Sequence, residues 1–258
     1  MIVPVHAFDS TSLVPITASG GYDCIRMRRP NRPLKQAVRR VALILLLALA
    51  LAPIALLLPF RWVAPPVTAF MLEYRFGAMP TRGYDYHWTG RDRISPWLPL
   101  AVVAAEDQKF PYHYGFDLDS INQAVASRPG RPRGASTISQ QTVKNLYLWP
   151  GRSLVRKGLE AWLTVYLELL WPKRRTLEVY VNVAEFGPGI YGAQAASLRY
   201  FGKAPADLTA HEAALLAAVL PNPERLSAAR PSVFVRARAA WIELQMQRLG
   251  GPGYLSRL

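Results

Sequence analysis

Residues 98–110 read LPLAVVAAEDQKF, a run of apolar residues at helical spacing that ends in two carboxylates. The spacing predicts a buried helix over 98–105. Glu106 follows directly, close in sequence to three aromatic residues, Phe110, Tyr112 and Phe116. Partial desolvation at such a place raises the pKa of a carboxyl toward the range useful for acid–base chemistry. Glu106 is therefore the first candidate base, and an ordinary capping or salt-bridged surface glutamate is the alternative. Of the polar residues that follow, His113 is expected to be a structural hydrogen-bonding residue, and Asp117 suits the N-cap of a helix beginning near Leu118.

Helical spacing continues through the remainder of the chain. The further runs are 138–148, 154–171, 177–184, 190–200, 210–220 and 233–249. Ser153 and Ser232 precede two of these runs, and Thr209 with Glu212 forms a capping-box pattern before another. No run shows sustained strand alternation. The sequence predicts a mainly α domain over 96–258.

Residues 41–60, VALILLLALALAPIALLLPF, carry no charged side chain. Twenty residues at a rise of about 1.5 Å span a hydrocarbon core of about 30 Å, so this segment predicts a transmembrane helix. Pro53 and Pro59 near its end are tolerated there as a kink and a stop. A cleaved signal peptide is the alternative, although it would have a shorter apolar core nearer the N-terminus.

The charges around this segment predict its orientation. Positions 1–40 carry seven basic residues before the span, whereas only Arg61 follows it ahead of a long neutral stretch. The positive-inside rule places the N-terminus in the cytoplasm. We expect a cytoplasmic basic tail over 1–40, a membrane-proximal connector or lobe over 61–95, and an exported domain after it.

The composition narrows the possible partners. The 258 residues include 31 Lys+Arg and 17 Asp+Glu, a formal charge of +14, which indicates an anionic partner. The single cysteine, Cys24, excludes an internal disulfide framework and any multi-cysteine metal site, and the four histidines are scattered. Because export separates the basic domain from nucleic acid, an anionic substrate at the membrane is favoured.

A second polar cluster, RGASTISQQ at 133–141, leads into a predicted helix that continues to Lys144 and Asn145. Free backbone N–H groups, hydroxyls and amides at a helix start can hold sugar hydroxyls or phosphate oxygens. By itself the cluster is only a polar helix start.

A third cluster places charged residues along one stripe of the run 154–171. Arg156 and Glu160 are four residues apart, Lys157 and Glu160 are three apart, and Arg152 lies one turn earlier. The alternative is a solvated face with an ordinary salt bridge, which stabilises a protein by less than about 1 kcal/mol. A fourth stretch at 173–182 adds Lys173, Tyr180 and Asn182, for which functional and structural roles are equally expected, and the glycines after it suggest a tight turn.

These clusters together resemble a known family. Five blocks agree in order: EDQKFPYHYGFD at 106–117, GASTISQQ at 134–141, RKGLE at 156–160, KRRTLEVYVN at 173–182 and HEAALLAAVLP at 211–221. Residues 98–227 resemble glycosyltransferase family 51, the peptidoglycan glycosyltransferase domain of class A penicillin-binding proteins and of monofunctional biosynthetic transglycosylases. The departures are Ala135 for the usual Gly, Ser139 for Thr and Val181 for Leu.

The resemblance implies a lysozyme-like helical body with a small membrane-associated lobe. No room remains after Leu226 for a transpeptidase domain, and its Ser-x-x-Lys and Lys-Thr-Gly motifs are missing, so the monofunctional enzyme is expected. Such an enzyme polymerises lipid II into β-1,4-linked glycan with inversion at the anomeric carbon and release of polyprenyl pyrophosphate. It would be a single-pass protein of the bacterial inner membrane, acting in the periplasm.

The resemblance also implies roles for individual residues. Glu106 matches the general base, and Glu160 matches the second family glutamate, near the departing pyrophosphate. Opposite charges beside Glu160 favour its ionised form, so we expect it to orient cations, or a Mg²⁺ or Mn²⁺ ion that arrives with the pyrophosphate, rather than to donate a proton. No permanently bound cofactor is expected. The remaining candidates are the pyrophosphate-binding Lys144, Arg152, Arg156 and Lys157, and the substrate-positioning Ser136, Thr137, Gln140, Gln141 and Asn145.

Two alternatives remain open at this point. A lysozyme-like or lytic enzyme also uses a glutamate on a helical fold, but it needs no cation cluster for a pyrophosphate. A non-catalytic, membrane-anchored scaffold would not depend on Glu106. The expected partners are lipid II, the growing lipid-linked glycan, the membrane, and proteins of the cell-division or elongation machinery.

Overall fold

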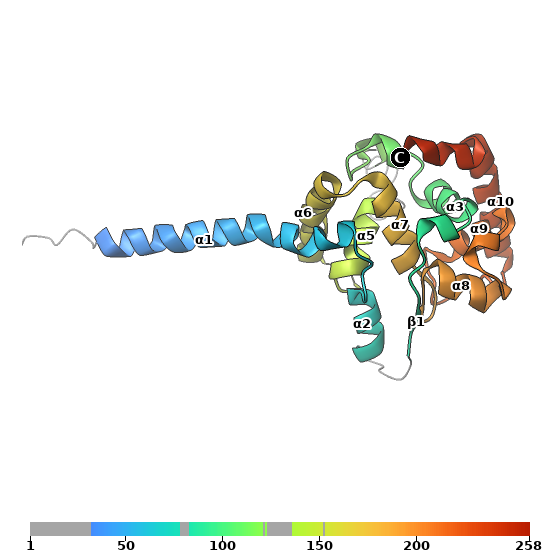
Figure 1. Ribbon diagram of the computed structural model, residues 1–258, viewed down its shortest axis with the longest axis horizontal. Coiled ribbons are helices and arrows are strands. Elements are labelled where there is room, and N and C mark those ends of the chain that lie inside the picture. The colour runs from blue at the N-terminus through green and yellow to red at the C-terminus, as the bar shows by residue number, and fades with distance from the viewer. Residues whose placement is uncertain (1–31, 78–82, 121, 123–135, 152) are drawn as a thin grey trace, which may run out of the picture. The chain divides into compact units, whose positions relative to one another are not determined.

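The computed structural model describes residues 32–77, 83–120, 122, 136–151 and 153–258. Its first helix, α1 (Arg32–Leu57), contains Pro53 and is followed by a short 3-10 turn, η1 (Pro59–Arg61) (Figure 1). The segment Leu34–Arg61 is long and apolar enough to cross a membrane. The helix expected over 41–60 is therefore present, and it begins earlier than the apolar run does.

Internal packing divides the chain into Met1–Leu46 and Leu47–Leu258. The main core of the second unit surrounds α9 (Ala210–Val219), in which all residues from 213 to 219 are buried. A helix that is apolar around its whole circumference must be enclosed, and α9 packs against α3 (Trp97–Glu106) and α10 (Val233–Arg248). The buried apolar residues of α3 fix this helix in the core, and so they fix the position of its last residue, Glu106.

A second apolar cluster joins α5 (Ile138–Tyr147), α6 (Leu154–Leu170) and α7 (Lys173–Val183). Leu57, at the end of α1, is fully buried in this cluster. The indole of Trp171 donates a hydrogen bond of 2.9 Å to the carbonyl of Leu57. The last turn of α1 is thus attached to the helices that carry the second and third polar clusters.

A small sheet lies beside the helices. Its strands β1 (Asp85–Tyr86), β2 (Glu185–Gly187) and β3 (Ile190–Tyr191) are arranged in the order β1-β3-β2, with β1 parallel and β2 antiparallel to β3. The remaining elements are α2 (Ala69–Phe76), α8 (Gly192–Phe201), and the 3-10 turns η2 (Arg91–Arg93), η3 (Phe110–Tyr112), η4 (Pro205–Asp207) and η5 (Gly251–Arg257).

The mainly α fold expected from the sequence is confirmed. Ser153, Thr209 and Ser232 are N-caps, and Thr209 and Glu212 complete the expected capping box. Asp117 also accepts a hydrogen bond from the backbone N–H of Ser120, as an N-cap does. The prediction of a helix over 190–200 was wrong for its first two residues, because residues 190 and 191 form β3.

Candidate active site

Glu106 lies at the C-terminal end of α3, and both of its carboxylate oxygens accept hydrogen bonds. Gln141 Nε2, from α5, donates to Oε2 over 3.0 Å. Arg238 NH2, from α10, lies 3.2 Å from Oε1. The Glu106 side chain is only 15% exposed. The carboxylate is therefore held in one orientation while one edge still reaches solvent.

Gln141 is itself held in place by α7. The hydroxyl of Tyr180 donates to Gln141 Oε1 over 2.8 Å, so the amide nitrogen of Gln141 faces Glu106. Tyr180 is fully buried, and burial raises the pKa of its hydroxyl well above the ordinary value, so it acts as a fixed donor. Tyr180, one of the undecided residues of the fourth stretch, thus supports the glutamate through Gln141.

Asp107 connects the end of α3 to the start of α5. Its buried carboxylate accepts from the backbone N–H of Ile138 over 3.0 Å and pairs with His113 Nε2 over 2.9 Å. The first contact fixes the start of α5 beside the end of α3. Gln141 and Lys144 are three residues apart on α5, so they lie on the same side of this helix, which faces Glu106. His113 is structural in this arrangement, as the sequence predicted.

Burial raises the pKa of the Glu106 carboxyl above its ordinary value. The hydrogen bond from Gln141 and the charges of Arg238 and Lys144 lower that pKa and offset part of the effect. A carboxylate with a raised pKa binds a proton more readily, so the surroundings of Glu106 suit a general base.

Glu160 lies on α6, where it is 2% exposed, and its two oxygens are also engaged. Arg156 NH1 donates to Oε2 over 2.8 Å and Lys157 Nζ to Oε1 over 2.5 Å. Lys157 also reaches the hydroxyl of Ser136 over 3.3 Å. The structure thus brings together a buried carboxylate and two cations from the third cluster with a hydroxyl from the second.

Lys144 links the two glutamates electrostatically. Burial lowers the pKa of its ammonium group; Glu160 and Glu106 raise that pKa, and Arg156 and Lys157 lower it. Since all four charges act on it, Lys144 lies within the field of both carboxylates. A half-buried cation in this position is suited to bind an anion that approaches Glu106 and Glu160 together.

Two of the predicted substrate-positioning residues have structural roles. Thr137 and Gln140 are buried, and each side chain bonds to the backbone of the other in the capping box that starts α5. Asn145 is also buried, and within the described residues it shares no hydrogen bond with the groups above. Arg152 lies outside the described residues.

Lys173 and Asn182, from the fourth stretch, serve other contacts. Lys173 Nζ donates to Glu168 over 2.8 Å, and Glu168 also accepts from Ser139. Asn182 bonds to both the N–H and the carbonyl of Thr89, each over 2.9 Å, and so fixes the segment after β1 to α7. Both residues maintain the fold in this structure.

Arg238 was not predicted from the sequence. It is 132 residues from Glu106 in the chain, on a helix with basic residues nearby at 236 and 248, and no local pattern distinguishes it. Only the packing of α10 against α3 and α9 brings it to the glutamate.

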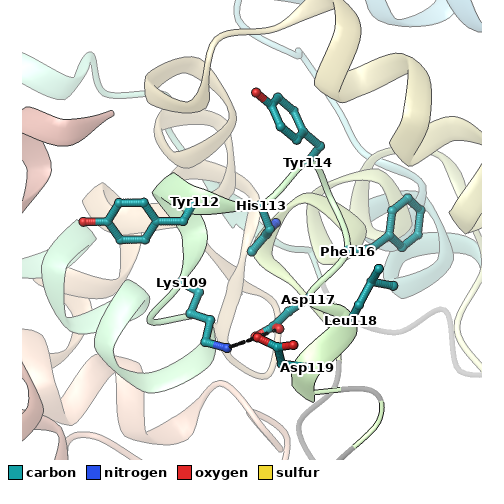
Figure 2. Close-up of a pocket in the computed structure, with 8 residues that line it drawn as sticks. All are labelled: Lys109, Tyr112, His113, Tyr114, Phe116, Asp117, Leu118 and Asp119. Carbon is teal, nitrogen blue, oxygen red and sulfur yellow. Dashed lines mark hydrogen bonds and ion pairs between the residues drawn. The ribbon is translucent and has the colours of Figure 1, made fainter.

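A cavity of about 540 Å³ is lined by residues between Lys109 and Asp119, which follow Glu106 in the sequence, and Figure 2 shows these lining residues. Lys109 Nζ lies 2.7 Å from Asp119 and 3.8 Å from Asp117, while Tyr112 and Tyr114 project away from this group (Figure 2). One lysine and two aspartates line this cavity, whereas on α5 and α6 the three cations Lys144, Arg156 and Lys157 outnumber Glu160, so the cavity is less suited to a pyrophosphate than that cluster.

The described residues do not assemble a protein-borne metal site. Among them, no group of three or more His, Cys, Asp or Glu side chains could hold an ion. Both oxygens of Glu160 already accept hydrogen bonds from cations. The sequence expectation concerns a Mg²⁺ or Mn²⁺ ion that arrives with the pyrophosphate, and it stays a prediction.

Comparison with known proteins gives consistent matches. Residues 76–247 match the family model described as transglycosylase. A biosynthetic peptidoglycan transglycosylase of Xanthomonas campestris pv. campestris (strain B100) is 51% identical over 236 residues, covering 89% of this chain and 96% of that protein. Proteins described in the same words from Klebsiella oxytoca and Xylella fastidiosa (strain 9a5c) are 53% and 50% identical, covering 84% of this chain and 93% and 91% of their own lengths. The matched region extends beyond 98–227 and includes β1.

Proposed function

The chain belongs to the transglycosylase family and is a peptidoglycan glycosyltransferase of cell wall biosynthesis, and we propose that Glu106 is its general base. We also propose that the cations of α5 and α6 hold the departing pyrophosphate. Lipid II and the growing glycan are its substrates. Membership of this family excludes the two alternatives that the sequence left open, a lysozyme-like or lytic enzyme and a non-catalytic scaffold.

The proposed reaction transfers one proton to Glu106 and one glycosyl group to the acceptor. Glu106 takes the proton of the 4-hydroxyl of the acceptor's N-acetylglucosamine while that oxygen attacks the anomeric carbon of the donor sugar. The bond from this carbon to the pyrophosphate oxygen breaks, and the electron pair leaves with the polyprenyl pyrophosphate. The observation that carries the proposal is the doubly held Glu106 carboxylate, whose pKa burial raises, within the field of Lys144.

Lys144, Arg156 and Lys157 would stabilise the negative charge that grows on the leaving pyrophosphate. Preplaced cations lower the barrier because they interact more strongly with the transition state than with the bound substrate. Glu160 would keep Arg156 and Lys157 in position, since it pairs with both. Ser136, bonded to Lys157, would add a hydroxyl to the same site. Any divalent ion would then be held mainly by pyrophosphate oxygens.

The apolar helix α1 fits a single-pass membrane anchor. We propose that its N-terminal side is cytoplasmic and that the part of the chain after the span, from residue 62 onward, lies on the periplasmic face, because the basic residues of positions 1–40 precede the span. The lipid tail of the substrate would then stay in the bilayer during the reaction. We also propose proteins of the cell-division or elongation machinery as partners, since glycan is polymerised where the wall grows.

The test is polymerisation of purified lipid II by the detergent-solubilised protein with Mg²⁺, with the products resolved by gel. Replacement of Glu106 by Gln keeps the size of the side chain and removes the base, so we expect a loss of rate of about 10²–10⁴-fold. Glu243→Gln is the matched control, because Glu243, on α10, pairs with the exposed His211 of α9 and, among the described residues, makes no contact with Glu106. Full activity of Glu106→Gln would disprove the role of this residue.

A further inference from the structure

Helix α10 carries aromatic side chains on a face that the core does not cover. Its buried side is formed by Val235, Ala239, Ile242 and Met246. On another face, Phe234 is 59% and Trp241 45% exposed. These two residues, with Ala237 and Arg238, line a cavity of about 250 Å³, which we call the α10 groove. Large exposed aromatic side chains that line a cavity are typical of a binding surface.

Arg238 belongs both to the α10 groove and to the candidate active site. Its NH2 group contacts Glu106 Oε1 over 3.2 Å. Its Nε is buried and has no hydrogen-bond partner within the described part of the chain. A ligand in the groove therefore lies one side chain away from the proposed base.

The position of the groove distinguishes the two substrates. The cations proposed for the donor's pyrophosphate come from α5 and α6, and α5 contacts Glu106 at Oε2 through Gln141. The α10 groove adjoins the other oxygen, Oε1, through Arg238. The acceptor is the substrate that must present a hydroxyl to Glu106 without bringing its own pyrophosphate among those cations.

We propose that the α10 groove binds the acceptor's terminal N-acetylglucosamine. The apolar face of the sugar packs on the rings of Trp241 and Phe234, and its 4-hydroxyl points toward Glu106. Aromatic rings supply a rigid apolar surface, and a few polar groups such as Arg238 fix the orientation of the ligand. This inference rests on the proposed role of Glu106 and names the binding surface for the acceptor.

The test separates the donor from the acceptor. Lipid II with its 4-hydroxyl blocked can act only as donor, and a disaccharide–pentapeptide with an alkyl ether in place of the pyrophosphate can act only as acceptor. We expect Trp241→Ala and Phe234→Ala each to raise the KM for the acceptor probe about tenfold, while the KM for the donor probe stays within about twofold. Trp241→Phe, which keeps an aromatic face, should recover most of the lost affinity.

Leu244→Ala is the matched control, because Leu244 is 43% exposed on the same helix and does not line the groove. Thermal unfolding of each variant checks that the fold is intact. Binding of the acceptor probe is also measured by saturation-transfer NMR, which needs no turnover. Unchanged binding and KM in both aromatic variants would overturn the proposal, and so would an equal rise in the two KM values. Normal coupling by Glu106→Gln would instead overturn the role of the base, whatever the aromatic variants do.

Discussion

At the scale of single residues, Arg238 adjusts the basicity of Glu106. Its positive charge lowers the pKa of the glutamate, whereas burial raises it. A general base must be ionised, so activity falls as the pH drops through this pKa. Replacing Arg238 by Gln removes the charge and moves the pKa up. We predict that the acid limb of the kcat/KM profile shifts to higher pH. Arg236→Gln, at an exposed position on the same helix, should leave the limb in place.

Asp107 contributes to stability rather than to chemistry. Its carboxylate is 7% exposed and holds both the backbone of Ile138 and the ring of His113. Asp107→Ala leaves both donors unpaired, so we predict a loss of about 2–4 kcal/mol in the free energy of unfolding. Chemical denaturation measures this loss. Asp119→Ala, which breaks only an exposed pair with Lys109, should cost less than about 1 kcal/mol. Equal losses in the two variants would contradict the assignment.

Single residues also show how far sequence patterns reach. The roles of Glu106 as candidate base and of His113 as a structural residue could be predicted from neighbouring residues, because an apolar helix and nearby aromatic residues are local sequence signals. Thr137 and Gln140 form the capping box that starts α5, a role that their spacing of three residues also fits, and their contact with substrate stays a prediction. Arg238 acts through a tertiary contact, for which the sequence carries no spacing rule.

At the scale of secondary structure elements, the long helices could be predicted and the sheet could not. Strands of two and three residues are too short to show alternation. The run 190–200 changes from strand to helix at Gly192, where φ is +84° and an added Cβ would lie 2.3 Å from the carbonyl oxygen of Asn182. Only glycine fits this close approach.

The β2–β3 hairpin contains a carboxyl group that makes stability depend on pH. The pKa of Glu185 is raised to about 7, mainly by burial and also by the charge of Glu224, while the hydrogen bond from the N–H of Gly189 lowers it and offsets part of the rise. The folded state therefore binds the proton more tightly than the unfolded state. The contribution of Glu185 to stability is therefore greatest below pH 4.5, the ordinary value of the group, and is lost as the pH rises through about 7.

We predict that Glu185→Gln removes this decline, which amounts to about 3 kcal/mol at most. The amide keeps an oxygen that can accept from Gly189, so the hairpin contact survives. Thermal unfolding between pH 5 and pH 8 measures the effect. The wild-type Tm should fall over this range more than that of the variant. Glu73→Gln, at an exposed position on α2, should behave like the wild type.

At the scale of the whole molecule, function depends on which side of the membrane each part occupies. The formal charge of +14 and the apolar segment Leu34–Arg61 suit an enzyme whose substrate is an anionic lipid. The basic residues of positions 1–40 predict that this part stays in the cytoplasm.

The single cysteine allows a direct test of this orientation. Cys24 precedes α1, and there is no other thiol in the chain. We predict that a membrane-impermeant maleimide does not label the wild type in spheroplasts and labels it after the membrane is permeabilised. In the matched control, Cys24→Ser combined with Ala229→Cys, the thiol lies at an exposed position of the unit that carries the active site. This thiol should react in intact spheroplasts, because the proposed orientation puts that unit's active site on the periplasmic face. Labelling of Cys24 without permeabilisation would reverse the orientation, and the active site would then lie on the cytoplasmic side.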